Sequence, residues 1–271
     1  VLMSNLQNIM LFSLFAGFIL LEFALGKTRG MNASRGDNIL DMLCLALLAG
    51  FTQPFIFWLV QQAGLAWAPE CQSAWAGLPW YAMAVILLVG DDMTQYWWHR
   101  ASHSPLLWPL HRAHHSAQYM SARIIYRNNF FYYLMMPGLW IAGVLLFLGI
   151  GGWVYVVYLS IKMTIILGAH CAWRWDEPLY KIKALHPVMW VVERTISTPA
   201  THWAHHALTN KDGIGHYTGN FGNMLFLWDV ILGTAHITRK YPEHIGLMDD
   251  RIHGQEHWAH QMFYPLSRSK R

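Results

Sequence analysis

The sequence predicts an all-α integral membrane protein, with about four to five membrane-embedded helices and a cytoplasmic helical cap. Three observations support this fold class. Hydrophobic residues make up 55% of the 271-residue chain and charged residues only 13%, about half of the charged share in globular proteins. Apolar runs long enough to cross a bilayer recur over the first two thirds of the chain. The 15 Trp and 12 Tyr residues suit a protein with two membrane–water interfaces.

A membrane-spanning helix needs about 20 mostly apolar residues. Five segments qualify: residues 6–25, 39–60, 80–98, 130–148 and 153–169. Pro54 predicts a kink in the second segment, and the third carries two acidic residues, Asp91 and Asp92. Gly151-Gly152 joins the last two segments in a tight hairpin. The sequence leaves open whether this hairpin crosses the membrane or enters it and returns.

The loop charges predict the orientation of the chain. Lys and Arg follow the first and third segments and are frequent after residue 170, whereas residues 61–79 contain neither. By the positive-inside rule the N-terminus lies outside and the C-terminus inside. Residues 99–129 and 170–271 then form the cytoplasmic cap of a single membrane-embedded domain spanning residues 1–271.

Two classes of protein are disfavoured by composition. The net charge of +4 comes from scattered residues, so we expect no nucleic-acid partner. Cys44, Cys71 and Cys171 have no paired spacing, so no disulfide framework is expected.

Eight histidines fall in three tight groups, each beside a hydrophobic run. The groups are His99-x3-His103, His111-x2-His114-His115 and His202-x2-His205-His206. Helical residues three or four apart share a face, so we expect the members of each group to point the same way. Thr198-Pro199 predicts the start of a helix before the last group. Before the second group, a helix could begin at Ser104-Pro105 or only at Pro109.

Imidazole is a common ligand of Zn, Cu, Fe and Ni. One ion takes about four to six ligands, some of which are water or substrate in a catalytic site. Eight histidines exceed that number, so two metal ions are the simpler account. The sequence contains no Glu-x-x-His, His-Glu-x-x-His or Cys-x-x-Cys, which argues against a carboxylate di-iron bundle, a zincin protease and a structural zinc site.

These three groups resemble the histidine boxes of the fatty acid hydroxylase/sterol desaturase superfamily. Asp92-x3-Tyr96-Trp97-Trp98-His99-Arg100 resembles the lead into the first box, and Thr198-Pro199 precedes the third. The segment from Asn220-Phe221-Gly222 through Trp228-Asp229 to Gly233-Thr234 resembles the closing segment. The resemblance covers about residues 85–235. It implies an integral membrane oxidoreductase whose histidine-ligated di-iron centre uses O2 to hydroxylate or desaturate lipids or sterols.

The resemblance also implies the site residues. The expected metal ligands are His99, His103, His111, His114, His115, His170, His202, His205 and His206. His170 is the additional histidine upstream of the third box, and His186 competes with it for this role. Asp92, Asn220 and Asp229 are the candidates for orienting the ligand rings.

Two Fe ions are the expected cofactors and O2 the co-substrate. Since no Rossmann-type Gly-x-Gly-x-x-Gly is present, electrons are expected from a cytoplasmic donor: a ferredoxin, a cytochrome b5-like protein or a reductase. The sequence leaves open the lipid or sterol, the choice between hydroxylation and desaturation, and the oligomeric state. The alternative is a non-enzymatic membrane protein that binds or transports a transition metal. A transporter is expected to place its ligands at mid-membrane depth, whereas these histidines follow the apolar segments.

Overall fold

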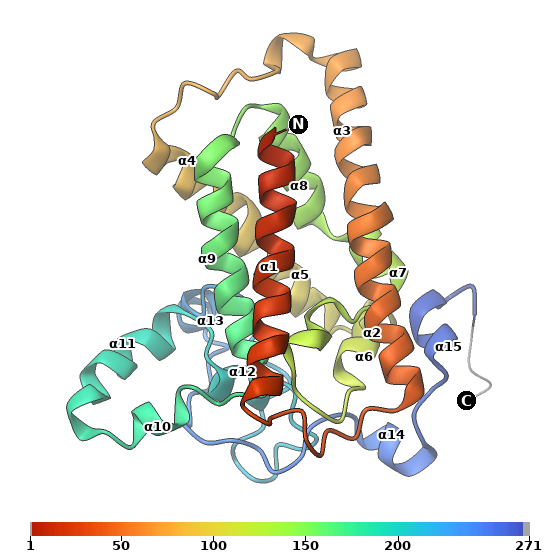
Figure 1. The fold of residues 1–271 in the computed structure, drawn as a ribbon, viewed down its shortest axis with the longest axis vertical. Helices are drawn as coiled ribbons and strands as arrows, with labels where there is room; N and C mark the ends of the chain where they lie inside the picture. Colours follow the sequence, from red (N-terminus) through yellow and green to blue (C-terminus); the bar gives the residue numbers. More distant parts are fainter. Residues whose placement is uncertain (1, 268–271) are drawn as a thin grey trace.

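The computed structural model describes residues 2–267 as helices and connecting loops. Long helices run side by side through the upper part of the molecule, and short helices gather at its lower end (Figure 1). Within the described residues, β-type pairing is confined to two isolated bridges, Ile196–Leu225 and Ala207–Ile245. The predicted all-helical fold class is therefore confirmed for this part of the chain. Residues 268–271 of the predicted cap lie outside it.

The upper part is built from these helices: α1 (Leu2–Ala24), α2 (Arg35–Leu47), α3 (Gln53–Trp67), α4 (Trp80–Leu87), α5 (Thr94–Ser102), α8 (Pro137–Phe147) and α9 (Gly152–His170). The lower part contains α6 (Trp108–His115), α7 (Phe130–Met135), α10 (Glu177–Tyr180), α11 (His186–Thr195), α12 (Pro199–His205), α13 (Leu227–Leu232), α14 (Met248–His253) and α15 (Trp258–Phe263). Short 3-10 turns lie at Pro69–Cys71, Ala122–Tyr126 and Lys183–Leu185.

Two of the long helices contain a π-helical turn. Leu48–Thr52 joins α2 to α3, and Leu88–Met93 joins α4 to α5. The first turn ends at Thr52, two residues before Pro54. The ring of Pro54 has no N–H and would clash with the carbonyl four residues earlier in an α-helix. The wider turn relieves that clash, so the irregularity predicted at Pro54 is a π turn within a continuous helix. The second turn carries Asp91 and Asp92.

Two of the described helices are long and apolar enough to cross a membrane, Arg35–Trp67 and Gly152–His170. Asn8–Ala24 and Pro137–Phe147 are shorter apolar helices. The prediction of one continuous helix over residues 130–148 is wrong, because the chain breaks at Met136, before Pro137, and forms α7 and α8. The 11 residues of α8 rise only about 16 Å, roughly half of the hydrocarbon thickness of a bilayer.

Close packing holds the short helix α8 against α3. A Cβ on Gly64 of α3 would lie 2.6 Å from the Phe147 ring, and a Cβ on Gly143 of α8 would lie 3.3 Å from Val60. The two glycines therefore let the helix backbones approach closely.

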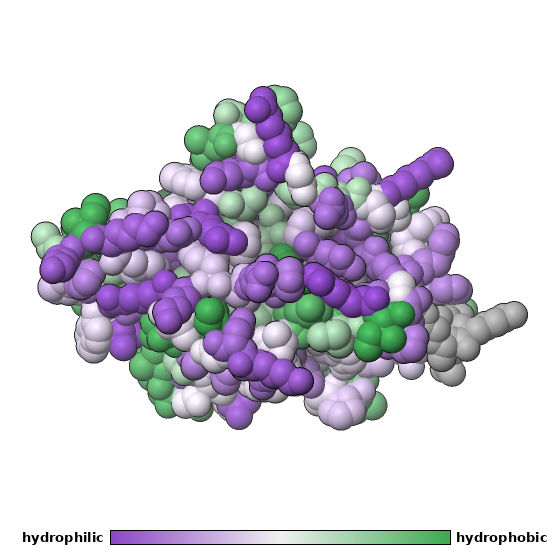
Figure 2. All heavy atoms as spheres, turned by 90° about the horizontal axis from the view of Figure 1, so that it is seen from below, coloured by the Kyte–Doolittle hydropathy of each residue, from purple (hydrophilic) through white to green (hydrophobic). Residues whose placement is uncertain are grey.

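The side surface of the long helices is apolar, whereas the lower end of the molecule is polar. Phe12, Phe23, Trp58, Val85 and Ile161 are all exposed on the long helices. Viewed from below, the surface is largely hydrophilic (Figure 2). Exposed apolar patches of this extent on a soluble surface would be a liability, so the distribution suits a protein whose helices are surrounded by lipid.

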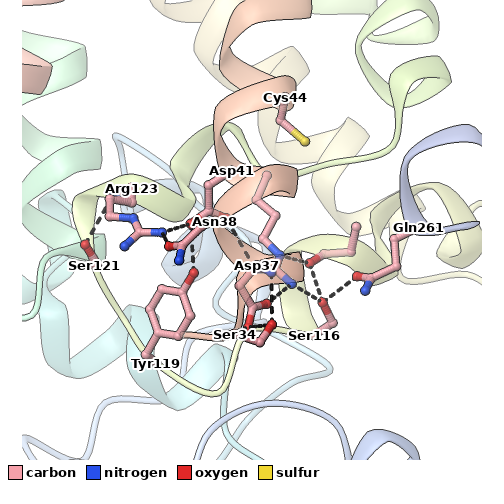
Figure 3. Close-up of polar contacts among 12 residues, drawn as sticks. Ser34, Asp37, Asn38, Asp41, Cys44, Ser116, Tyr119, Ser121, Arg123 and Gln261 are labelled. Atoms are coloured by element: carbon pink, nitrogen blue, oxygen red, sulfur yellow. Dashed lines mark hydrogen bonds and ion pairs between the residues drawn. The ribbon is translucent and has the colours of Figure 1, made fainter. Parts of the chain in front are cut away.

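A buried polar cluster joins α2 to the end of α6. The side chain of Arg127 is fully buried, and its guanidinium lies 2.6 Å from Asp37 Oδ1 and 3.3 Å from Asp41 Oδ1. It also donates to the carbonyl of Ala113 and to Ser116 Oγ. Figure 3 shows both carboxylates beside the α2 ribbon, with Asp37 next to Ser34 and Asp41 nearer Tyr119 and Arg123. Because Ala113 and Ser116 bracket two histidines of the second box, this cluster fixes the position of that box.

Candidate metal centre

Two short helices carry the second and third histidine boxes. The helix α12 begins as predicted: Thr198 caps it, the Thr198 and Thr201 side chains form a reciprocal capping box, and Pro199 lies in the first turn. The helix α6 begins at Trp108 with Pro109 in its first turn, so the later of the two predicted starts is the observed one. Both helices place their histidines within two turns of a fixed N-terminus.

The structure brings together all nine histidines that the sequence singled out, in two groups. The five-histidine group contains His99, His103, His111, His115 and His205, and the four-histidine group contains His114, His170, His202 and His206. Within each group, one ring nitrogen from every histidine lies within 4.8 Å of the others. All nine side chains are buried except that of His103, which is half-buried. The two groups touch, because the rings of His115 and His206 stack with centroids 4.4 Å apart.

Each HxxHH box is divided between the two groups. The box on α6 sends His111 and His115 to the five-histidine group and His114 to the other. The box on α12 does the reverse, since His202 and His206 join the four-histidine group and His205 joins the five-histidine group. Only residues four apart stay together, because adjacent helical residues are turned by about 100°. The expectation that all three histidines of a box point the same way is therefore wrong.

The hydrogen bonds of His99 and His205 leave two lone pairs facing each other. The Nδ1 of His99 lies 2.7 Å from the carbonyl oxygen of Phe221, and the Nδ1 of His205 lies 2.7 Å from that of Gly219. Because a carbonyl only accepts, each Nδ1 carries the proton, and each Nε2 of a neutral ring is a bare acceptor. These two Nε2 atoms are 3.0 Å apart. Ligands about 2.1 Å from one ion and at right angles lie about 3 Å apart, so the pair fits a shared metal ion.

The four-histidine group has the same arrangement around His170. Its Nδ1 lies 2.8 Å from the carbonyl oxygen of Ile166, which leaves the Nε2 lone pair free. This Nε2 is 2.8 Å from Nε2 of His202 and 3.4 Å from Nε2 of His114. Nε2 of His206 lies 3.2 Å from that of His202. The four Nε2 atoms therefore converge on one point.

Unpaired buried nitrogens support the same interpretation. Among the described residues, the Nε2 atoms of His103, His111 and His115 are buried without a hydrogen-bond partner. Leaving a buried polar atom unsatisfied costs about 1–3 kcal/mol, and a metal ion would satisfy all three. Burial lowers the pKa of His115 and His206 well below the ordinary value of imidazole, and nearby imidazoles lower it further. The rings are therefore neutral at pH 7, the form that binds a metal.

A loop of four residues orients one ring from the first box and one from the third. Gly219 and Phe221 supply the carbonyls that accept from His205 and His99. Between them, Asn220 adopts a left-handed backbone with φ of 57°. Its Nδ2 donates to the carbonyl of Thr201 on α12, 2.9 Å away. The loop is thereby tied to the helix that carries the third box.

Asp229 holds the same loop from the other side. Its carboxylate accepts from the N–H groups of Phe221 and Gly222 at 2.8 and 2.6 Å, and from Thr234 Oγ1 at 2.6 Å. A Cβ on Gly222 would lie only 2.7 Å from this carboxylate, so glycine is needed for the close approach. Asn220 and Asp229 thus act on the rings through backbone carbonyls.

The contacts of Asp92 are with the segment that precedes Asp229. The Oδ2 of Asp92 accepts from Trp228 Nε1 at 2.8 Å and from the N–H of Leu225 at 3.3 Å. These contacts fasten the segment before Asp229 to the π turn above His99. Asp92 therefore positions the closing segment.

The structure places His170, but not His186, among the grouped histidines. His170 ends α9 and lies in the four-histidine group. His186 begins α11 and its Nε2 lies 2.9 Å from the carbonyl oxygen of Tyr180, outside both groups.

The sequence gives little indication of one polar partner of the rings, Asn128. Asn128 is buried, and its Oδ1 lies 2.8 Å from Nδ1 of His111. Its Nδ2 donates to Tyr133 Oη at 3.2 Å, which directs the carbonyl oxygen toward the histidine. The only signal in the sequence is a pair of asparagines after the second box, and asparagines there equally suggest a turn.

Comparisons with known proteins agree with this geometry. The sequence model of the fatty acid hydroxylase family matches residues 84–234, which include all nine histidines. Alkylglycerol monooxygenase of Danio rerio is 27% identical over 233 residues, which cover 81% of this chain. The chain spans about half of that relative, since the match covers 46% of its length. No solved structure matches the chain significantly.

Proposed function

Since this chain belongs to the fatty acid hydroxylase family, we propose that it is an O2-dependent di-iron monooxygenase acting on a C–H bond of a lipid or sterol. The observation that carries the proposal is the convergence of nine imidazoles in two touching groups. A lipid substrate agrees with the printed activity of the relative, alkylglycerol monooxygenase. Desaturation, in which a second hydrogen is removed from the same substrate, uses the same centre.

The nine histidines would hold two iron ions, which when bound supply the reduction of O2 and the oxidation of the C–H bond. Imidazole is a common ligand of iron. Because the sequence contains no Glu-x-x-His, we expect the ligands to be histidines rather than carboxylates. The carbonyls of Gly219, Phe221 and Ile166 hold the Nδ1 protons of three rings, so the Nε2 lone pairs stay directed inward. Burial of the rings excludes bulk water, which limits side reactions.

We place this centre at the cytoplasmic side of a multi-pass membrane protein. The support is the loop charge, together with the position of the histidines at the ends of α5 and α9, toward the lower part of the molecule (Figure 1), whose lower face is largely hydrophilic (Figure 2). Electrons would come from a carrier protein at this face. A hollow of about 690 Å³ there is lined by five basic side chains, Lys27, Arg29, Arg174, Lys181 and Arg251, and by two acidic ones, Glu177 and Glu243. An excess of positive charge steers an acidic carrier.

The test combines metal analysis with lipid analysis. We expect purified protein to contain two iron ions per chain. We also expect membranes that contain it to convert one lipid class, in the presence of O2 and a reductant, to a product heavier by one oxygen atom. His205→Ala should abolish the product, whereas His257→Ala, outside both groups, should not. A single rapidly exchanging metal with no oxidised lipid would support the non-enzymatic metal-binding alternative.

A further inference from the structure

Three neighbouring cavities, which share lining residues, lie between the side surface of the helices and the histidines. A cavity of about 340 Å³ lies between α1 and the α2–α3 helix, lined by Phe12, Leu48 and Gln53. It shares Leu48 and Gln53 with a second cavity of about 150 Å³. A third, of about 50 Å³, is lined by four of the histidines and shares Gln95 and Tyr133 with the second. The three cavities thus follow one another from the apolar side surface to the metal ligands.

The second cavity is mostly apolar but contains a charged pair. Lys162 Nζ lies 2.7 Å from Asp91 Oδ2, and Tyr158 Oη donates to the same oxygen at 2.9 Å. Both Asp91 and Lys162 are buried and line this cavity. Ionisable residues inside membrane helices are costly and usually functional. The pair faces the path along which a substrate would reach the centre.

An unpaired amide lies between this pair and the histidines. Gln95 lines both the second and the third cavity. Its Oε1 is buried and has no hydrogen-bond partner within the described residues. An unsatisfied acceptor of this kind is rare in native structures, and a donor from a bound molecule would satisfy it.

The charges of the site limit the group it can bind. Asp91 would repel an anionic headgroup and Lys162 a cationic one, whereas a neutral hydroxyl can donate to Gln95 Oε1 or Asp91 and accept from Lys162. On α9, Lys162 precedes His170 by eight residues, which corresponds to about 12 Å along the helix. Gln95 lies closer to the ligands, four residues or about 6 Å before His99 on α5.

We propose that Asp91, Lys162 and Gln95 form a binding site for the hydroxyl group of a neutral, long-chain amphiphile, about 6–12 Å from the metal ligands. This site selects the substrate of the proposed monooxygenase and therefore rests on that function. Its substrate class is a long-chain alcohol. The molecule would reach the site from the bilayer, between α1 and the α2–α3 helix.

The test measures binding of radiolabelled hexadecan-1-ol and hexadecane to the purified full chain, with and without iron. We expect the alcohol to bind more tightly than the alkane. Gln95→Leu should weaken alcohol binding about threefold to tenfold, the value of one neutral hydrogen bond, and leave alkane binding unchanged. Gln62→Leu is the matched control, because Gln62 is exposed on α3. Equal binding of the two probes, or equal weakening of both by Gln95→Leu, would overturn the proposal.

A second variant tests the charged pair. Asp91→Leu/Lys162→Leu removes both charges of the pair together, so it should also lose the preference for the alcohol. If this double variant does not fold, Gln95→Leu decides the question, because Gln95 loses no hydrogen-bond acceptor contact on substitution. Preference for the alcohol without any lipid oxidation would support this site and contradict the proposed monooxygenase. Oxidation that is as fast with the alkane as with the alcohol would support the monooxygenase and contradict this site.

Discussion

The Nε2 atoms of His170 and His202 lie 2.8 Å apart, although 32 residues separate them in the sequence. One ends the long apolar helix α9 and the other lies on the short helix α12. Nε2 of His170 is a bare acceptor, because its Nδ1 donates to the carbonyl of Ile166, and a metal ion between the two nitrogens would bind both rings through their lone pairs. The metal ion proposed here would therefore join the membrane part of the chain to its cap.

This contact predicts the effect of removing His170. We expect His170→Ala to retain about one of the two iron ions, because the four-histidine group loses a ligand while the five-histidine group keeps all of its own. His186→Ala should retain both ions. Elemental analysis of the two purified variants makes the comparison. Equal iron in both would contradict the assignment of His170.

The Asn128–His111 hydrogen bond predicts a weaker metal site when it is removed. Loss of such an orienting partner typically lowers metal affinity by 10–100-fold. We therefore expect Asn128→Ala to bind iron by roughly that factor more weakly, with His111 itself intact. Competition with a chelator measures the affinity. Asn210→Ala, at an exposed position, serves as the control, and a similar loss there would show that the effect is not specific.

The buried guanidinium of Arg127 predicts a large loss of stability. Arg127→Met leaves Asp37 buried with its closest cation gone, and breaking a buried ion pair in this way costs about 3–5 kcal/mol. Arg123→Met should cost much less, because Arg123 is partly exposed and its partner Asp41 keeps Arg127. Denaturant unfolding of the two variants in detergent gives the difference. Similar midpoints would argue against the anchoring role of Arg127.

The division of each box predicts cooperative metal binding. An ion in one group orders α6 and α12 together, and both helices also supply ligands to the other group. We expect the second ion to bind more tightly than the first, so that chains with a single ion are scarce during titration. Native mass spectrometry counts the ions on each chain. A statistical mixture of empty, singly and doubly loaded chains would mean that the two sites are independent.

Much of the site could be predicted because histidine boxes have a spacing that few other structures require. Composition indicated the helical class, and Thr198-Pro199 indicated where α12 begins. The rest depended on features without a side-chain signature. The carbonyls of Gly219 and Phe221 orient two rings, and every residue type has such a carbonyl.

Two further differences between the predicted and the observed structure have physical causes that hydropathy does not record. Residues 130–148 are apolar throughout, so nothing in their hydropathy indicates the break before Pro137, which then takes the first turn of a new helix. The splitting of the boxes follows from the turn of about 100° between His114 and His115. The rule that helical residues three or four apart share a face cannot show which histidine of a box joins which of the two adjacent groups.

The π turn at Leu88–Met93 also sets the rotational register of everything below it. A π turn contains one residue more than an α-helical path of the same shape, and each residue turns the helix by about 100°. Deleting one residue from this turn would restore a regular helix but rotate His99 and His103 away from their partners. A change that leaves the apolar helix intact, and every ligand in the chain, would thereby dismantle the metal centre.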